Sequence, residues 1–313
     1  MGGDDILYIV GYEKYRDYLK TGIYKYFPEF LMPVLKPKII DRILHNDMPI
    51  GNIAGINLKC IDFSDERRLD DYILSILKIK SPEDNLLLLE DGENIDKGII
   101  KEIEEKTSMK IPTGEKIRRN NLPLIIGEFF NSLGEDIYNQ ELLLICDEKE
   151  ISIDAINTLS KSIKYITLIG SKEDEKEEIY MRALSDTGLS IFQPENIDKK
   201  ISSYGVIINL SDELRISLNG IRRKILIIDF SDGKPLKNVQ KSKINDIIIE
   251  DISFRTSDLD IEESQWINDS ISSRFLEGFK HNDKEKFYKV ITEKGSYFVS
   301  DFISTYIKTK GRI

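Results

Sequence analysis

Four polar residues in the second half of the chain directly follow short apolar runs, at positions where a side chain could contact a ligand. Asn209 and Asp229 end the runs GVIIN and KILIID, and Ser171 and Lys172 follow the run YITLIG. Open α/β sheets bind ligands outside the carboxyl ends of their strands, so these four are the candidate cofactor-binding residues. Polar residues at strand ends also serve as loop caps, and for Asn209 and Asp229 the sequence favours neither role.

Ser171 and Lys172 allow a more specific interpretation. After the second strand of a dinucleotide-binding sheet, these residue types would suit the 2′-phosphate of NADP. The simpler interpretation is that Ser171 is the N-cap of the next helix, with Asp174 three residues later, and that Lys172 faces water. We adopt the simpler interpretation and expect no cofactor, with NADP as the alternative.

The turn after the apolar run ELLLIC lacks the residues that a dinucleotide requires. A dinucleotide turn uses G-x-G-x-x-G because the backbone must approach the pyrophosphate without a Cβ in the way. Here the run is followed by DEKEISIDA, residues 147–155, which contains no glycine. Asp147, Glu148 and Glu150 would place the protein's own carboxylates at the helix N-terminus, where the helix dipole favours an anion. The sequence therefore predicts no ordinary dinucleotide site at this turn.

Cysteine and histidine are scarce, which limits metal and nucleophilic chemistry. Cys60 and Cys146 both lie in apolar runs and are expected to be small buried residues. His45 and His281 are the only histidines and lie in separate predicted helices, so we expect no metal site. Catalytic residues remain unknown at this stage, and the sequence leaves open whether the protein is an enzyme.

Short apolar runs alternate with amphipathic segments in the second half. The predicted strands are 141–146, 165–169, 189–193, 205–210, 224–230 and 246–251. Helical spacing of Ile153, Ile156 and Leu159 follows the first strand. Sequential parallel strands are joined by right-handed crossovers, so we expect a parallel sheet in which 141–146 lies beside 165–169 and 205–210.

The first half is also α/β, and the end of the chain differs from both. Predicted strands there are 6–10, 56–61 and 85–90, and predicted helices are 12–21, 36–46, 65–79 and 94–107. Near the end, aromatic stripes that include Trp266, Phe275 and Phe302 predict buried helices. A chain of 313 residues exceeds one hydrophobic core. We therefore predict three parts: an N-terminal α/β domain (1–114), a parallel-sheet domain (115–259) and C-terminal helices that pack back on the domains (260–313).

This order of elements resembles the amino-acid-dehydrogenase-like Rossmann proteins, a group that includes shikimate dehydrogenase, glutamyl-tRNA reductase and one of the two components of dipicolinate synthase. The resemblance covers roughly residues 115–310 and is strongest in GLSIFQPENIDKKISSYGVIINLSD and KILIIDFSDGKP, which are similar to strand-and-turn motifs of the group. It implies an α/β fold with an N-terminal α/β domain, a Rossmann-like parallel-sheet domain and closing helices. No motif for the group's catalytic residues matches, so none is transferred.

Charge restricts the partners. A net charge of −10 and a pI near 5.0 repel phosphate backbones and anionic lipid, so nucleic acid and membranes are not expected partners. The N-terminal residues lack the basic start of a secretory signal, and a cytoplasmic location is expected. A small-molecule ligand, a protein partner or a homo-oligomer fits this composition.

Three functions are compatible with these observations. The first is a non-catalytic binding, regulatory or assembly module that has lost dinucleotide binding. The alternative is an NAD(P)-dependent oxidoreductase with an atypical cofactor turn. The third is a small-molecule enzyme whose site lies between the predicted domains and does not involve this turn. The substitution of DEKE for the glycines favours the first.

Overall fold

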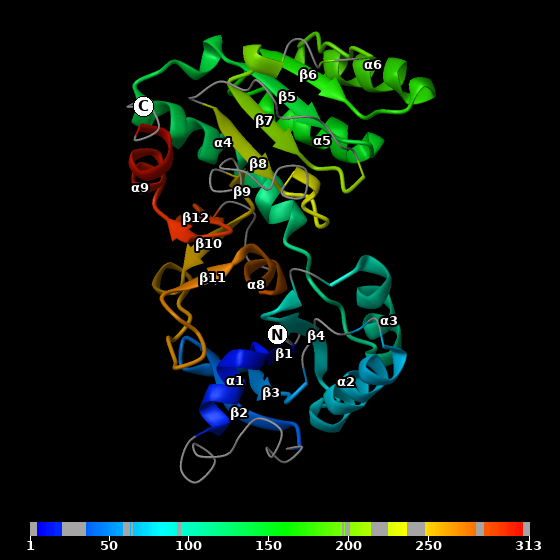
Figure 1. The fold of residues 1–313 in the computed structure, drawn as a ribbon, viewed down its shortest axis with the longest axis vertical. Helices are drawn as coiled ribbons and strands as arrows, with labels where there is room; N and C mark the ends of the chain where they lie inside the picture. Colours follow the sequence, from blue (N-terminus) through cyan, green and yellow to red (C-terminus); the bar gives the residue numbers. More distant parts are fainter. Residues whose placement is uncertain are drawn as a thin grey trace. The chain divides into compact units, whose positions relative to one another are not determined.

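The chain forms two compact units. A computed structural model describes residues 5–20, 36–58, 63, 65–92, 95–195, 197, 201–213, 225–236, 248–279 and 285–308. Unit 1 consists of Met1–Thr113 and Arg255–Lys280, and unit 2 consists of Gly114–Phe254 and His281–Ile313 (Figure 1). Residues 255–259, which we had placed with the parallel-sheet domain, belong to unit 1. Both units contain parallel strands and helices, so the predicted α/β fold class is confirmed.

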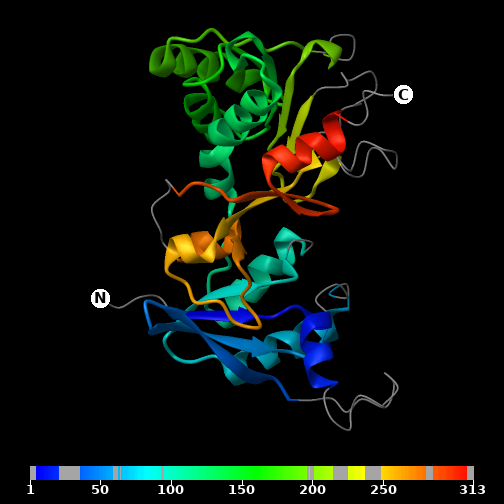
Figure 2. The same ribbon diagram turned by 90° about the vertical axis from the view of Figure 1, so that its left-hand side faces the viewer.

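Unit 1 is built on a four-stranded sheet with the order β2-β3-β1-β4. Its strands are β1 (Asp5–Ile9), β2 (Lys38–His45), β3 (Met48–Gly55) and β4 (Asp84–Leu89). β1 runs parallel to β3 and β4, whereas β2 and β3 form an antiparallel hairpin, seen in blue in Figure 2. The predicted helix at 36–46 was wrong. Asn46 and Asp47 have φ values of 50° and 60°, as a two-residue hairpin turn requires, and the residues before them therefore pair as a strand.

Helices cover both faces of this sheet. α2 (Glu66–Ile79) and α3 (Lys97–Thr107) share one apolar core with Leu7, Ile9 and Leu87 of the strands. On the other face, Phe275 of α8 (Ser273–Gly278) meets Tyr8 at 5.4 Å between ring centroids (Figure 1). α1 (Tyr12–Leu19) directly follows β1, and the 3₁₀ helix η9 (Thr256–Leu259) and strand β11 (Ser270–Ser272) complete the unit.

Unit 2 is built on a parallel sheet with the order β6-β5-β7-β8-β9. Its strands are β5 (Glu141–Ile145), β6 (Tyr165–Ile169), β7 (Val206–Asn209), β8 (Leu226–Asp229) and β9 (Ile248–Ile249). The predicted neighbours of 141–146 are therefore confirmed. The predicted strand 189–193 is reduced to Phe192, which forms a parallel bridge with Thr167 of β6.

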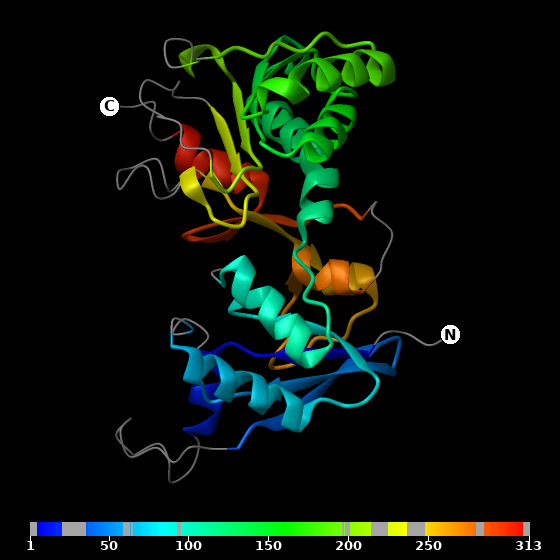
Figure 3. The same cartoon turned by 90° about the vertical axis from the view of Figure 1, so that its right-hand side faces the viewer.

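Two crossover helices, α5 (Lys149–Leu159) and α6 (Lys176–Thr187), contact each other along the same side of this sheet, as right-handed crossovers require (Figure 3). α4 (Glu115–Leu133) precedes the sheet and contains Pro123, which cannot donate a backbone hydrogen bond. Helix α4 continues through this proline to end at Gly134 in the left-handed conformation. Short 3₁₀ helices are η5 (Ile137–Asn139), η6 (Glu173–Glu175) and η7 (Ile201–Ser203).

The C-terminal region is not only helical, so the prediction of helices over 260–313 was wrong in part. β10 (Asp251–Arg255), β12 (Lys289–Thr292) and β13 (Gly295–Tyr297) pair antiparallel and precede α9 (Val299–Phe302) and a π-helix (Ile303–Lys308). Residues 246–251, predicted as one strand, include β9 and the start of β10, which belong to different sheets. β-branched and aromatic residues at 289–298 fit a hairpin as well as a helix, and the turn at Gly295, with φ 137°, decides between them.

The predicted burial of the aromatic side chains is confirmed. Trp266, Phe275 and Phe302 are 3%, 5% and 1% exposed. Trp266 and Phe275 are buried within unit 1, where Trp266 meets Tyr18 at 5.1 Å between ring centroids. Phe302 lies in unit 2 and packs beside Tyr306. These residues close the cores of their own units.

Candidate functional site

The structure brings two of the four predicted site residues together. Asn209 and Asp229 are register partners at the carboxyl ends of β7 and β8, and both are fully buried. The Asn209 amide Nδ2 donates to Asp229 Oδ1 at 2.9 Å, to Ser231 Oγ at 3.2 Å and to the Ser211 carbonyl at 3.0 Å. The polar atoms that could face a ligand are thus directed at neighbouring protein groups.

Asp229 is the centre of this strand-end network. Its Oδ2 accepts from the backbone N–H of Leu236 at 3.2 Å, and Ser231 donates to its Oδ1. Lys234 Nζ donates to the carbonyls of Asp229 and Glu250 at 2.8 and 2.9 Å. Burial raises the pKa of Asp229 against the opposing effects of Ser231 and Lys234, and burial also lowers the pKa of Lys234. The network satisfies its own buried groups, as a structural polar cluster does.

Arg118 joins the same region from α4. Its side chain is 2% exposed, its Nη2 donates to the Phe230 carbonyl at 3.2 Å, and it lies 3.6 Å from Asp232 Oδ1. A charged side chain among the apolar residues of α4 must find buried partners, and these contacts supply them.

Ser171 and Lys172 lie after β6, apart from the Asn209 pair. The predicted N-cap role of Ser171 was wrong, because the 3₁₀ helix begins at Glu173 and Lys172 is the residue that precedes it. Ser171 Oγ is buried without a hydrogen-bond partner. The Lys172 side chain is 72% exposed and lies 3.9 Å from Glu175.

The β5–α5 turn has three residues, Cys146, Asp147 and Glu148, and α5 begins at Lys149. The turn is packed tightly against the end of β6, since a Cβ on Gly170 would lie 2.8 Å from the Cys146 carbonyl oxygen. Gly170 also has a φ of 102°, which side chains other than glycine rarely adopt. Cys146 is fully buried, and burial raises the pKa of its thiol, so this thiol is not activated as a nucleophile.

Basic side chains near the turn are already paired. Lys149 Nζ donates to Glu178 at 3.0 Å, and Arg182 binds both carboxylate oxygens of Glu150 at 3.0 and 3.2 Å. These pairs join α5 to α6. The first turn of α5 therefore adds the carboxylate of Glu150. The nearby basic side chains, Lys149 and Arg182, each bind a glutamate carboxylate.

The sheet of unit 2 defines the class of the protein. With Phe192 as the reduced third strand, the order corresponds to the Rossmann order 3-2-1-4-5-6, so the protein is Rossmann-like. No known family model matches the chain, and no curated protein matches it by sequence.

Solved structures overlap with the chain at low identity. L-tryptophan dehydrogenase from Nostoc punctiforme is 11% identical, with a TM-score of 0.33 over 74% of this chain and 65% of that chain, so the match spans less than two thirds of the dehydrogenase. A dipicolinate synthase component from Bacillus halodurans is 12% identical, with a TM-score of 0.35 over 75% and 84%. Aspartate transcarbamoylase from Trypanosoma cruzi is 12% identical, with a TM-score of 0.29 over 72% and 71%. With all three TM-scores below 0.5, the class depends on the strand order itself.

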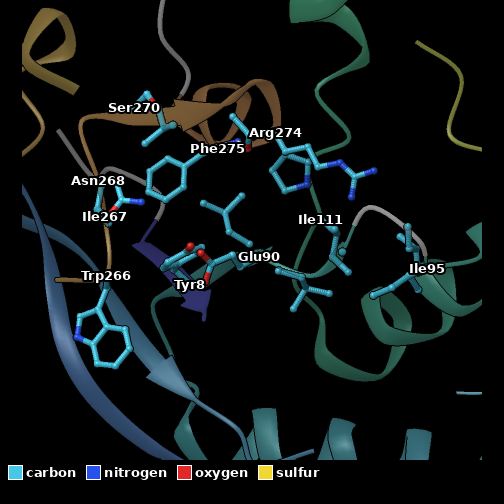
Figure 4. Close-up of a pocket in the computed structure, with 17 residues that line it drawn as sticks. Tyr8, Glu90, Ile95, Ile111, Trp266, Ile267, Asn268, Ser270, Arg274 and Phe275 are labelled. Carbon is cyan, nitrogen blue, oxygen red and sulfur yellow. Dashed lines mark hydrogen bonds between the residues drawn. The ribbon is translucent and has the colours of Figure 1, made fainter. Parts of the chain in front are cut away.

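Unit 1 contains a pocket of about 200 Å³ at the carboxyl ends of β1 and β4 (Figure 4). Its wall is about equally polar and apolar, and the apolar part includes Leu88, Leu89, Ile95, Ile100, Ile111 and Phe275. Its polar lining includes Tyr8, Glu90, Asn268, Ser270, Ser272 and Arg274. The sequence analysis did not predict this site, because its two sides come from segments far apart in the chain.

Glu90 organises one side of the unit 1 pocket. Its Oε2 accepts from the backbone N–H of Gly11 at 2.7 Å, and its Oε1 accepts from Lys14 Nζ at 3.2 Å. Lys14 also donates to the Trp266 carbonyl at 2.7 Å. Tyr8 hydrogen-bonds Glu90, and burial, reinforced by that carboxylate, raises the pKa of the Tyr8 hydroxyl. Glu90 therefore has a structural role, because its hydrogen bonds hold neighbouring groups in place at the pocket wall.

The described part of the chain contains neither a metal-binding cluster nor a membrane-spanning helix. There, no three histidine, cysteine, aspartate or glutamate side chains gather where they could hold a metal ion. No helix within the described ranges combines the length and hydropathy needed to cross a bilayer. Cys60 and His281 lie outside the described residues.

Proposed function

We propose that this protein is a Rossmann-like binding module that does not hold a dinucleotide at its β5–α5 turn and performs no NAD(P)-dependent reaction. The observation that carries the proposal is the turn itself. It has no glycine, and Asp147 and Glu148 stand at the N-terminus of α5, where the pyrophosphate of a bound dinucleotide would lie.

Electrostatics supports this interpretation. A pyrophosphate at the turn would bring its negative charges within a few ångströms of the two carboxylates. At an effective dielectric near 20, each close like-charge pair costs about 4 kcal/mol. The helix dipole contributes only about 0.3–1 kcal/mol, or about 2 kcal/mol in a partly buried geometry, so repulsion dominates.

The buried pair at the neighbouring strand ends supports it as well. Asn209 and Asp229 bond to each other and to the loop residues that follow their strands. A ligand that used either side chain would have to break these bonds and leave a buried group unpaired, which costs about 1–3 kcal/mol for each group.

Thermal unfolding with NAD, NADP and adenine nucleotides tests the proposal. A ligand at one hundred times its Kd would add about 2.7 kcal/mol of stability, and we expect no shift at millimolar ligand. A double variant, Asp147→Gly with Glu148→Gly, removes the charge and opens the backbone, and it is expected to gain weak NADP affinity. The matched control, Glu262→Gln with Glu263→Gln, neutralises two exposed carboxylates of unit 1 and should gain none.

The alternative, an NAD(P)-dependent oxidoreductase with an atypical turn, is favoured by one observation. The Ser171 hydroxyl is buried without a partner beside the exposed Lys172, at the strand end where a 2′-phosphate would bind. Stabilisation of the wild-type protein by NADP that is lost in Ser171→Ala would show an NADP site at this strand end and favour this alternative over the proposal. We expect neither Ser171→Ala nor Lys172→Ala to change the response to NADP.

A further inference from the structure

We infer that the unit 1 pocket binds a small carboxylate with an apolar body, and that Arg274 holds the carboxylate group. This inference is independent of whether the β5–α5 turn of unit 2 binds a dinucleotide. It depends on the composition of the pocket, the engagement of Glu90 and the position of Arg274 in the pocket wall.

Arg274 is the only cationic residue among those that line the pocket in the described part of the chain. In Figure 4 its guanidinium extends over the side of the pocket where Ile95 and Ile111 lie, opposite Trp266. A guanidinium has five N–H donors in a planar fork, so it can retain a protein partner and still bind a ligand carboxylate. The pocket thus offers a donor array of the kind that recognises a carboxylate.

The one anionic lining residue is less suited to bind a ligand. Glu90 already accepts from Gly11, Lys14 and Tyr8, and the Lys14 ammonium at 3.2 Å offsets its charge. A cationic ligand would have to compete with these donors for the same oxygens. The lining therefore favours an anion over a cation.

The apolar lining residues indicate which kind of group would accompany the carboxylate in the ligand. Ile95, Ile100, Ile111 and Phe275 present hydrocarbon surface, which favours an apolar group next to the carboxylate. The volume of about 200 Å³ is below the range of about 300–1,000 Å³ that is typical of pockets for drug-sized ligands. Such a space suits a branched or aromatic acid of modest size better than a nucleotide.

Gly92 lets the Arg274 guanidinium lie close to the backbone of the pocket wall. It is buried in the pocket wall, and a Cβ at this position would lie 3.2 Å from Arg274 Nη1 and 3.1 Å from Leu89 Cβ. Any larger residue would press on both groups. The absence of a side chain at Gly92 therefore allows Arg274 its position in the pocket wall.

Fluorescence titration tests the inference directly, because Trp266 is the only tryptophan and lines the pocket. The probes are 4-methylpentanoate, its amide 4-methylpentanamide and the amine 3-methylbutylamine, with phenylacetate and phenylacetamide as an aromatic pair. We expect the acids to bind at least about tenfold more tightly than the amides, since a charge-assisted bond is about twice as strong as a neutral one. The amine should not bind.

Two variants test whether Arg274 causes the preference for acid over amide. Arg274→Gln should abolish the preference for acid over amide, whereas Arg67→Gln, an exposed arginine on α2 of the same unit, should retain it. Equal binding of acid and amide, tighter binding of the amine, an absence of binding at millimolar acid, or a preserved preference in Arg274→Gln would each overturn the inference. The comparison of acid and amide needs only the wild-type protein, so it decides the matter even if Arg274→Gln does not fold.

Discussion

The two units differ in the side chains at the carboxyl ends of their parallel strands. In both units, carboxylates lie at the N-terminus of the helix that follows the first strand. In unit 1, Glu90 and Asp91 from the end of β4 accept from the backbone N–H groups of Gly11 and Tyr12 at 2.7 and 2.8 Å. In unit 2, the carboxylates of the turn come from the turn itself. Both helix N-termini are thus supplied with anions by the protein.

The two units differ in what occupies the strand ends near these helices. In unit 2 the ends of β7 and β8 are occupied by the Asn209–Asp229 network, in which the donors and acceptors hydrogen-bond to one another. In unit 1 the end of β4 opens into the pocket below Arg274 and Phe275. In both units the strand-end side chains bond to protein groups, but in unit 2 they bond to each other across neighbouring strands, whereas in unit 1 they border a pocket.

The largest expected effect comes from breaking the buried network of unit 2. Asp229→Ala removes one acceptor of Asn209 and the acceptor of the Leu236 N–H, and it takes away a carboxylate that offsets the charge of Lys234, which should cost about 3–5 kcal/mol. Hydrogen exchange of β7 and β8 amides should accelerate at least about a hundredfold, since each 1.4 kcal/mol is a factor of ten. Asp186→Ala, at an exposed position on α6, serves as the control. Equal exchange in the two variants would show that the network is not structural.

An intermediate effect is expected from Tyr8, which supports the unit 1 pocket. Its folded-state pKa is raised above the unfolded value of 10.0, so its stabilising contribution is complete below pH 10 and is lost as the pH rises beyond it. Between pH 8 and pH 11 the wild-type protein should lose about 1.4 kcal/mol more stability than Tyr8→Phe. Urea unfolding followed by Trp266 fluorescence measures the difference, and parallel losses in both proteins would contradict the assignment.

The smallest expected effect concerns the ion pair between α5 and α6. Arg182 and Glu150 bond at 3.0 Å, but their side chains are 44% and 69% exposed. Solvent screening should limit the cost of Arg182→Gln to about 0.5 kcal/mol or less, and the cost should vanish at high salt. Urea unfolding at low and high salt concentration tests this. A cost that persists in high salt would show that Arg182 stabilises the contact between α5 and α6 by more than a screened ion pair.

The sequence predicted most of the parallel sheet because its strands are continuous apolar runs with separate helices between them. It failed at 36–46, where Ile39, Ile43 and Leu44 fit both a helical and a strand spacing, and the turn at Asn46 decides the outcome. It located Asn209 and Asp229 at the strand ends but could not tell that they bond to each other. It missed Arg274 and Glu90 as one site, because only the fold brings residues so far apart in the chain to the same pocket.

The central claim is that the β5–α5 turn of unit 2 does not hold a dinucleotide. Amide NMR spectra of the full chain during a titration with NADP test it most directly. We predict that the signals of residues 146–152 and 170–172 do not move at millimolar NADP. Saturable shifts of these signals, with those of Ser171 and Lys172 among the largest, would place the cofactor on the turn and contradict the account.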